Sequence, residues 1–144
     1  MVSSPNLGTQ MREYLCGEFR NVAQRMQTNT TDFEVALYWY SGTFGAVQRA
    51  VNIEPNVDLF TINAVLQFTH GQLSARLNRQ LEDADRPIII TPEIIMGLVG
   101  HLNELANRIQ NYSDYSDVLE KIARIGYAST GNGFYLRMSN HLEV

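Results

Sequence analysis

The sequence predicts a mainly α-helical fold, an antiparallel bundle of about five helices with a minor C-terminal β-hairpin or short strand pair. Apolar residues recur every three or four positions along most of the chain, which is the spacing of one buried helix face. Capping residues, prolines and glycines punctuate these periodic stretches. Only near the C-terminal end does the apolar period change to two, which is typical of a strand. We therefore expect residues 1–144 to form one helical domain, with a flexible arm over 1–5 and a non-helical tail over 126–144.

The composition is that of one folded chain in a reducing compartment. The 144 residues are 44% hydrophobic, which is enough apolar surface to bury a core without disulfides or a metal ion. Cys16 is the only cysteine, and the first residues show no basic start followed by an apolar run. The apolar stretches over 35–48 and 94–100 are too short to cross a bilayer. These features predict a cytoplasmic protein with no membrane contact.

The first helix is expected from Pro5 to about Gln27. Ser4 is placed to cap it, and Pro5 suits the first helical position because its missing N–H costs nothing there. The apolar face of this helix comprises Leu7, Met11, Leu15, Phe19, Val22 and Met26. Cys16 lies beside that face with no basic neighbour or histidine evident, so we interpret it as a core or boundary residue and not as a reactive thiol.

The second helix is expected over residues 31–51. Thr31 and Glu34 have the spacing of a capping box, in which each satisfies an amide of the first turn. Apolar residues occupy every face of the stretch, and no charged residue occurs between Glu34 and Arg49. A helix that is apolar all round is either central in a fold or part of an interface.

The third helix is expected to begin at Asp58, a candidate cap that follows the break at Glu54-Pro55-Asn56.

Glycines inside the predicted helices cost about 1 kcal/mol each relative to alanine, so Gly42 and Gly45 of the second helix mark a kink or a close helix contact. Gly71 is a possible interruption of the third helix. An acidic cluster then forms a solvated turn, without the spacing of an EF-hand, at Glu82, Asp83 and Asp85.

The fourth helix has the clearest start in the sequence. Thr91 is the cap, Pro92 takes the first position, and Ile90 is placed to pack against Ile95 as a hydrophobic staple. Its apolar face comprises Ile95, Leu98, Leu102, Leu105 and Ile109. The preceding residues 88–90 predict a short strand or extended chain, because β-branched residues favour that state.

The last helix is expected to start at Ser113 or Ser116. Its apolar face comprises Val118, Leu119, Ile122 and Ile125. The turn Gly131-Asn132-Gly133 then contains Asn-Gly, a strong hairpin signal, and the following residues alternate with period two. We expect a small hairpin here, or a strand that pairs with residues 88–90.

The strongest sequence indication of function is a cluster of four aromatic residues on the second helix: Tyr38, Trp39, Tyr40 and Phe44. Four rings within seven residues cannot all point into the core, so at least one should emerge toward a partner, a neighbouring helix or solvent. Charged residues make up only 18% of the chain and Lys121 is the only lysine, which favours self-association. These residues are candidates for an interface or pocket. We expect a non-enzymatic protein-interaction or regulatory module that forms a homo-oligomer.

A winged-helix-like DNA-binding regulator is the first alternative. The last helix followed by a glycine-turned hairpin resembles a recognition helix and wing in topology, with Arg124 and Arg137 as the candidate DNA contacts. The net charge of −4 and the acidic residues Asp114 and Asp117 at the front of that helix oppose binding to phosphates.

A small-molecule-binding bundle or an enzyme is the second alternative. His101 and Glu104 are the one His–Glu pair at helical spacing and form a candidate polar site. A metal site in a helical bundle draws several such pairs from facing helices, and no nucleophile elbow, phosphate-binding glycine loop or zinc-protease spacing occurs. We predict no metal, no cofactor and no catalytic residue, and an enzyme is the less favoured class.

Overall fold

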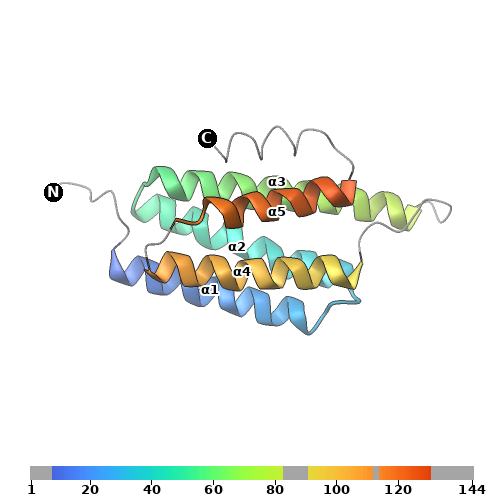
Figure 1. Ribbon diagram of the computed structural model, residues 1–144, viewed down its shortest axis with the longest axis horizontal. Coiled ribbons are helices and arrows are strands. Elements are labelled where there is room, and N and C mark those ends of the chain that lie inside the picture. The colour runs from blue at the N-terminus through green and yellow to red at the C-terminus, as the bar shows by residue number, and fades with distance from the viewer. Residues whose placement is uncertain (1–7, 83–90, 112–113, 131–144) are drawn as a thin grey trace.

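The computed structural model describes residues 8–82, 91–111 and 114–130, and these residues form five helices (Figure 1). In chain order the helices are α1 (Thr9–Gln27), α2 (Phe33–Ile53), α3 (Val57–Glu82), α4 (Pro92–Asn111) and α5 (Ser116–Thr130). The prediction of a mainly α-helical bundle is confirmed. The predicted hairpin at residues 131–133 and the predicted strand at 88–90 lie outside the described residues.

The helices pack as a closed ring. Their main contacts run from α1 to α2, α3, α5 and α4, and then back to α1. Figure 1 shows that α1, α3 and α5 run in one direction and that α2 and α4 run in the opposite one. A ring with an odd number of helices cannot alternate in direction at every contact, so one neighbouring pair must be parallel. That pair is α3 and α5, which refines the prediction of an antiparallel bundle.

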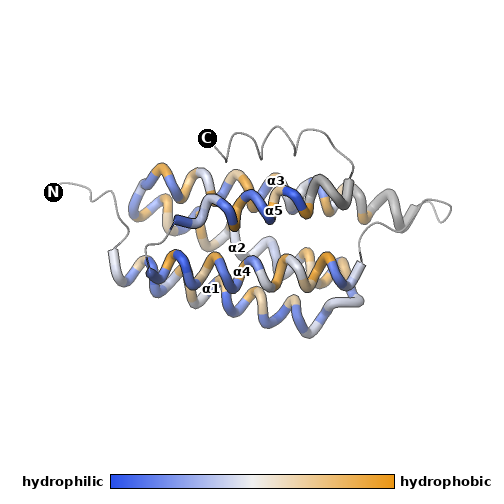
Figure 2. Tube along the Cα trace, viewed as in Figure 1, coloured by the Kyte–Doolittle hydropathy of each residue, from blue (hydrophilic) through white to orange (hydrophobic). Residues whose placement is uncertain are grey.

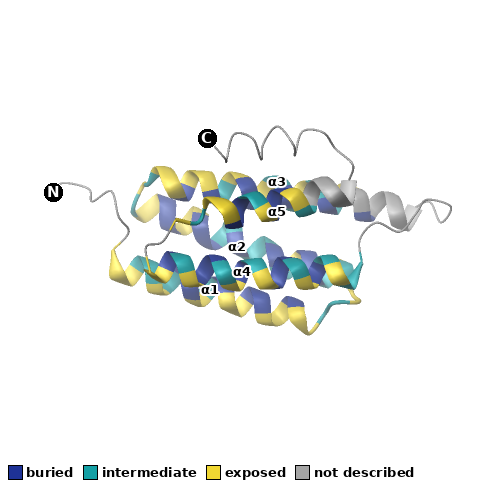
Figure 3. Ribbon diagram, in the orientation of Figure 1, coloured by how far each residue is buried: buried dark blue, intermediate teal, exposed yellow. Residues whose placement is uncertain are grey.

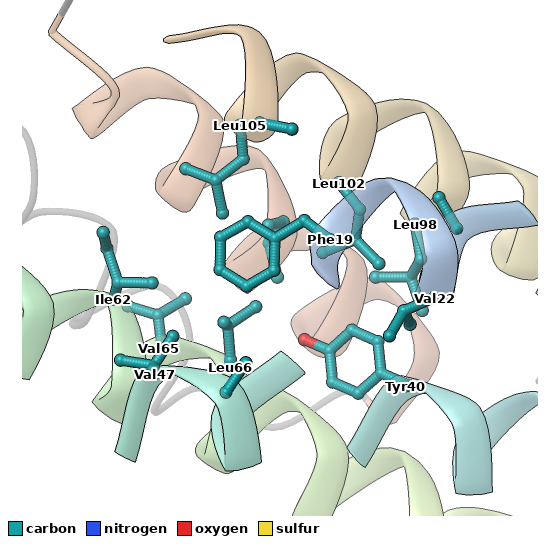
Figure 4. Packing of buried hydrophobic residues seen from close by; sticks show 14 of the residues in the cluster. Phe19, Val22, Tyr40, Val47, Ile62, Val65, Leu66, Leu98, Leu102 and Leu105 are labelled. Carbon is teal, nitrogen blue, oxygen red and sulfur yellow. The ribbon is translucent and has the colours of Figure 1, made fainter. Parts of the chain in front are cut away.

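The apolar faces of all five helices meet inside this ring. Hydrophobic and hydrophilic residues alternate along each helix (Figure 2), and so do buried and exposed ones (Figure 3). Figure 4 shows Phe19 of α1, Tyr40 of α2, Leu66 of α3 and Leu98 of α4 directed into one cluster. The predicted face of α4 is buried throughout, and in the described part of α1 the predicted positions from Leu15 onward are buried as well.

The cap predicted for α4 is confirmed. The Thr91 hydroxyl accepts a hydrogen bond from the Ile94 amide at 3.4 Å, and Pro92 is the first helical residue. Ile90, the other half of the predicted staple, lies outside the described residues.

The caps predicted for α2 and α3 are wrong by one or two positions. Helix α2 is capped by Asp32, whose carboxylate accepts from the Val35 amide at 3.3 Å. Helix α3 is preceded by Asn56, whose side-chain oxygen accepts from the amide of Asp58 at 2.8 Å. In both cases the residue that accepts from the free amides of the first turn is an Asp or Asn that lies one or two positions from the predicted cap.

The ends of α1 and α5 also differ from prediction. Gly8, in an extended conformation, precedes α1, and Ser4 and Pro5 lie outside the described residues. Helix α5 continues to Thr130, so residues 126–130 are helical and do not belong to a non-helical tail. A single glycine at position 126 costs too little, about 1 kcal/mol, to end a helix by itself.

Two glycines allow close packing between helices. A Cβ at Gly42 would lie 3.2 Å from Val22 of α1, and one at Gly97 would lie 3.4 Å from Ile125 of α5. Gly42 therefore marks a close helix contact. Gly71 does not interrupt α3, which is helical throughout its length.

Cys16 is a buried residue at the contact between α1 and α4. Its thiol donates a hydrogen bond to the Ala106 carbonyl at 2.9 Å. Two basic neighbours that the sequence interpretation overlooked, Arg20 and Arg12, favour the thiolate, but burial has the larger effect and raises the pKa of the thiol. Cys16 is therefore a core residue, as predicted, and burial disfavours the reactive thiolate form.

Among the described residues, no helix combines the length and the apolar character needed to span a membrane.

Candidate interaction surface on helix α2

The four predicted aromatic residues of α2 separate into three environments. Tyr40 is fully buried, Trp39 and Phe44 are partly buried against the core, and Tyr38 is 69% exposed. Helix geometry requires this divergence, because successive residues are about 100° apart around the axis. Tyr38 is therefore the aromatic residue that α2 presents to solvent.

Trp39 is held between α1 and Tyr38. The Arg25 guanidinium of α1 lies 4.4 Å from the centre of the Trp39 ring, in a cation–π contact. The Tyr38 ring meets the Trp39 ring edge to face, with centroids 5.5 Å apart and planes at 71°. Tyr38 thus rests on an anchored neighbour, which lowers the entropy it would lose on binding a partner.

Beside Tyr38 lies an open groove between α2 and α3 with a volume of about 450 Å³. Its lining residues come from the first half of α2 and the second half of α3: Glu34, Leu37, Tyr38, Ser41, His70, Ser74 and Leu77. A second hollow of about 360 Å³ shares Glu34 and Leu77 with the groove and extends to the start of α2 at Thr31. The two form one concave strip along the end of the α2–α3 pair.

His70 forms part of the groove wall, and the sequence interpretation did not select it. Its Nε2 atom lies 3.1 Å from the Leu37 carbonyl of α2, and its ring stacks on Tyr40 with centroids 5.9 Å apart. Burial lowers the pKa of His70, so the ring is neutral near pH 7 and Nε2–H donates to the carbonyl. A sequence signal existed, since His70 lies at helical spacing from Leu66, Leu73 and Leu77.

Two polar side chains of the groove wall are engaged in hydrogen bonds to backbone carbonyls of α2. The Ser41 hydroxyl donates to the Tyr38 carbonyl at 2.5 Å, and the His70 Nε2 is engaged by Leu37. Nucleophilic catalysis needs a hydroxyl directed at a base that a third group orients. Within the part of the chain that the structure describes, no carboxylate forms an ion pair with His70.

The predicted polar pair His101 and Glu104 lies on α4, and neither residue lines the groove. His101 Nδ1 is 3.7 Å from a Glu104 carboxylate oxygen, and Glu104 also binds Arg108 at 2.9 Å. Arg108 in turn pairs with Asp117 and donates to the Asp114 carbonyl at 2.8 Å. The pair therefore belongs to a network that joins the end of α4 to the start of α5.

No group of three potential metal ligands (His, Cys, Asp or Glu) occurs within residues 8–82, 91–111 and 114–130.

Of the two predicted DNA contacts, Arg124 lies within the described residues. Arg124 donates from Nε to Glu120 at 2.7 Å on the same helix, so a carboxylate on α5 already neutralises it. Arg137 lies outside the described residues.

A second apolar surface escaped the sequence interpretation. Ile53, Val57 and Phe60 are 77%, 75% and 54% exposed, and we call them the α2–α3 corner because they flank the turn between those helices. These residues fall outside the regular apolar spacing of their helices, which is the signal that could have identified them.

Comparison with known proteins adds no identification. The chain matches no protein-family model, and no curated protein or solved structure is significantly similar to it.

Proposed function

We propose that this protein is a non-enzymatic interaction module that forms a homo-oligomer through helix α2. The observation that carries the proposal is the exposure of Tyr38, 69% of whose surface is accessible on a helix without any charged residue between Glu34 and Arg49. We also propose that the protein is cytoplasmic, because its one cysteine is a buried free thiol and free thiols are typical of a reducing compartment.

The chemistry of this surface supports self-association. Tyrosine, tryptophan and arginine dominate the binding energy of protein interfaces, and Tyr38, Trp39 and Arg25 lie in contact here. Charged residues are depleted at the centre of an interface, as they are in the middle of α2. Burying Tyr38 would remove a large apolar ring from water while its hydroxyl keeps a polar end for the rim.

A small-molecule ligand in the groove is a second candidate. Its volume of about 450 Å³ falls within the range of ligand pockets, about 300–1,000 Å³. The groove is open to solvent, however, and ligand pockets normally enclose most of the ligand surface. We therefore rank this function below self-association.

The proposal is tested by measuring the mass of the full chain by light scattering on a size-exclusion column at about 1–100 μM protein. The wild type should have at least twice the mass of the chain, and Tyr38→Arg should reduce it to the monomer. Phe60→Arg, a matched change at the α2–α3 corner, should leave the mass unchanged. A wild-type monomer over the whole range would refute the proposal, and loss of assembly only in Phe60→Arg would move the interface to the corner.

A further inference from the structure

We infer that two copies of this chain pair with their α2 helices antiparallel across a two-fold axis that passes beside Ser41 and Gly42. This inference rests on the proposed function, in which the partner is a second copy. It adds a definite geometry, in which Glu34 of each copy faces Arg49 of the other and Tyr38 of each copy faces Gly45 of the other.

The first step is the outward face of α2, which comprises Glu34, Tyr38, Ser41, Gly42, Gly45 and Arg49. All six residues are exposed or partly exposed. At 100° per residue they lie within about 60° of Tyr38 around the helix axis, so they form one continuous stripe. Figure 3 shows that α2 runs along the bundle, so the stripe is elongated.

The second step is the distribution of charge on the outward face. Glu34 and Arg49 are both exposed and lie at opposite ends of an uncharged stretch. At 1.5 Å per residue they are about 22 Å apart along the helix. Among the side chains that the structure describes, none forms an ion pair with Glu34.

The third step is symmetry. In a two-fold interface, residue i of one copy contacts residue j of the other, and residue j contacts residue i in return. An axis beside Ser41 and Gly42 brings each Glu34 opposite an Arg49, giving two attractive contacts. A parallel arrangement would instead place glutamate against glutamate and arginine against arginine, which is unfavourable. The charge pattern therefore favours the antiparallel pair.

The fourth step is shape. A Cβ added at Gly45 would meet only Arg49 Nη1, at 3.8 Å, so Gly45 adds no side chain to the surface there, whereas Tyr38 is prominent. The same two-fold axis that pairs the charges places the Tyr38 ring of each copy over Gly45 of the other. Arg49 donates from Nε to the Tyr14 hydroxyl at 2.7 Å, which fixes its guanidinium beside Gly45. The cation would then flank the incoming ring, a favourable contact.

The fifth step is the crossing point. The Ser41 hydroxyl already donates to the Tyr38 carbonyl, so Ser41 brings no unsatisfied donor to the contact. Gly42 packs against Val22 of α1 and adds no side chain that would hold the two α2 helices apart. Small residues at a crossing allow helix backbones to approach closely.

A charge-reversal cycle tests the predicted pairing. The dissociation constant of the full-length dimer is measured by sedimentation equilibrium for Glu34→Arg, Arg49→Glu and the double variant. Each single variant should weaken the dimer about tenfold or more, because two attractive contacts become repulsive, and the double variant should recover most of the loss. Glu93→Arg, an equal charge change on α4, is the matched control and should have little effect.

Cysteine cross-linking tests the position of the axis independently. With oxidised glutathione as oxidant, Ser41→Cys should link to its own symmetry mate, because the axis passes beside residue 41 and brings its two copies close together. Glu34→Cys should not link to itself but should link to Arg49→Cys when the two variants are mixed. Buried Cys16 should not compete.

The outcomes separate this inference from the proposed function. A dimer that is insensitive to both charge reversals, or whose double variant fails to recover, refutes the antiparallel pairing and leaves self-association standing. Cross-linking of Glu34→Cys to itself does the same. A wild-type chain that stays monomeric refutes the proposed function, and the inference with it.

Discussion

Helices α2 and α4 are nearly equal in length but differ in how their apolar residues are used. Helix α4 buries one face, with Leu102 at its centre, and its exposed face is polar apart from Met96, which is 42% exposed. Helix α2 buries Tyr40 and Val47 in the same core, yet it also presents Tyr38 to solvent. The core accounts for every apolar residue that the predicted pattern placed on α4, whereas α2 carries apolar surface beyond what the core requires. That excess is where we look for function.

The largest expected effect is the loss of a core residue from α4. Leu102→Ala should lower the free energy of unfolding by about 2–5 kcal/mol, because Leu102 is fully buried and its removal leaves a cavity. Urea denaturation followed by circular dichroism measures this change. Asn103→Ala, at the exposed neighbouring position, should change the free energy by less than about 0.5 kcal/mol. Similar values for the two variants would contradict the description of α4.

Helix caps are expected to contribute next. Asp32→Ala should lower the free energy of unfolding by about 1 kcal/mol, since it removes the acceptor for the Val35 amide at the start of α2. Thr91→Ala should have a similar effect at the start of α4. Thr31→Ala is the control in the same denaturation experiment. If Thr31→Ala cost more than Asp32→Ala, the cap would be the one that the sequence predicted.

Acidification should weaken the contact between α2 and α3 through His70. Burial lowers the pKa of His70 in the folded state, so the unfolded chain binds more protons below the ordinary value of about 6.5. The contribution of neutral His70 to the free energy of unfolding is therefore fully present above that pH and is lost as the pH falls below it. His70→Gln retains a donor for the Leu37 carbonyl and does not titrate. Between pH 7.5 and 5.5 the wild type should lose more stability than this variant, and equal losses would contradict the assignment.

The smallest expected effect on the fold is at Tyr38. Tyr38→Ser should change the free energy of unfolding of the monomer by less than about 0.5 kcal/mol, because the ring is mostly exposed. The measurement is made at the lowest protein concentration that gives a signal, so that assembly does not contribute. A loss comparable with that of Leu102→Ala would assign Tyr38 to the core and remove the difference between the two helices.

The sequence predicted the elements of the fold better than their arrangement. The periodic apolar face and the Thr91 cap identified α4 because both signals are local. The order of helices around the ring was not predictable, since packing α4 against α1 and α5 against α3 depends on contacts between distant segments. The same limit explains the caps of α2 and α3, where two polar residues compete and the path of the preceding loop decides between them.

The candidate site was predictable in part for the same reason. Four rings within seven residues require that one should leave the core, and this follows from helix geometry alone. Which ring is exposed depends on where α1 and α3 lie around α2, and their positions leave Tyr38 exposed to solvent. His70 was missed because its role depends on α3 remaining helical through Gly71, which places the ring against Leu37 and Tyr40.

The fluorescence of Trp39 at different protein concentrations tests the central claim most directly. Trp39 is the only tryptophan, it is partly exposed, and it contacts Tyr38 on the surface that we propose for self-association. On dilution from about 100 μM, its emission maximum should shift to longer wavelength over the same concentration range in which the mass falls to the monomer, because water then reaches the ring. An emission maximum that stays constant while the mass falls would show that the surface formed by Tyr38 and Trp39 is not in the interface, and would contradict the account.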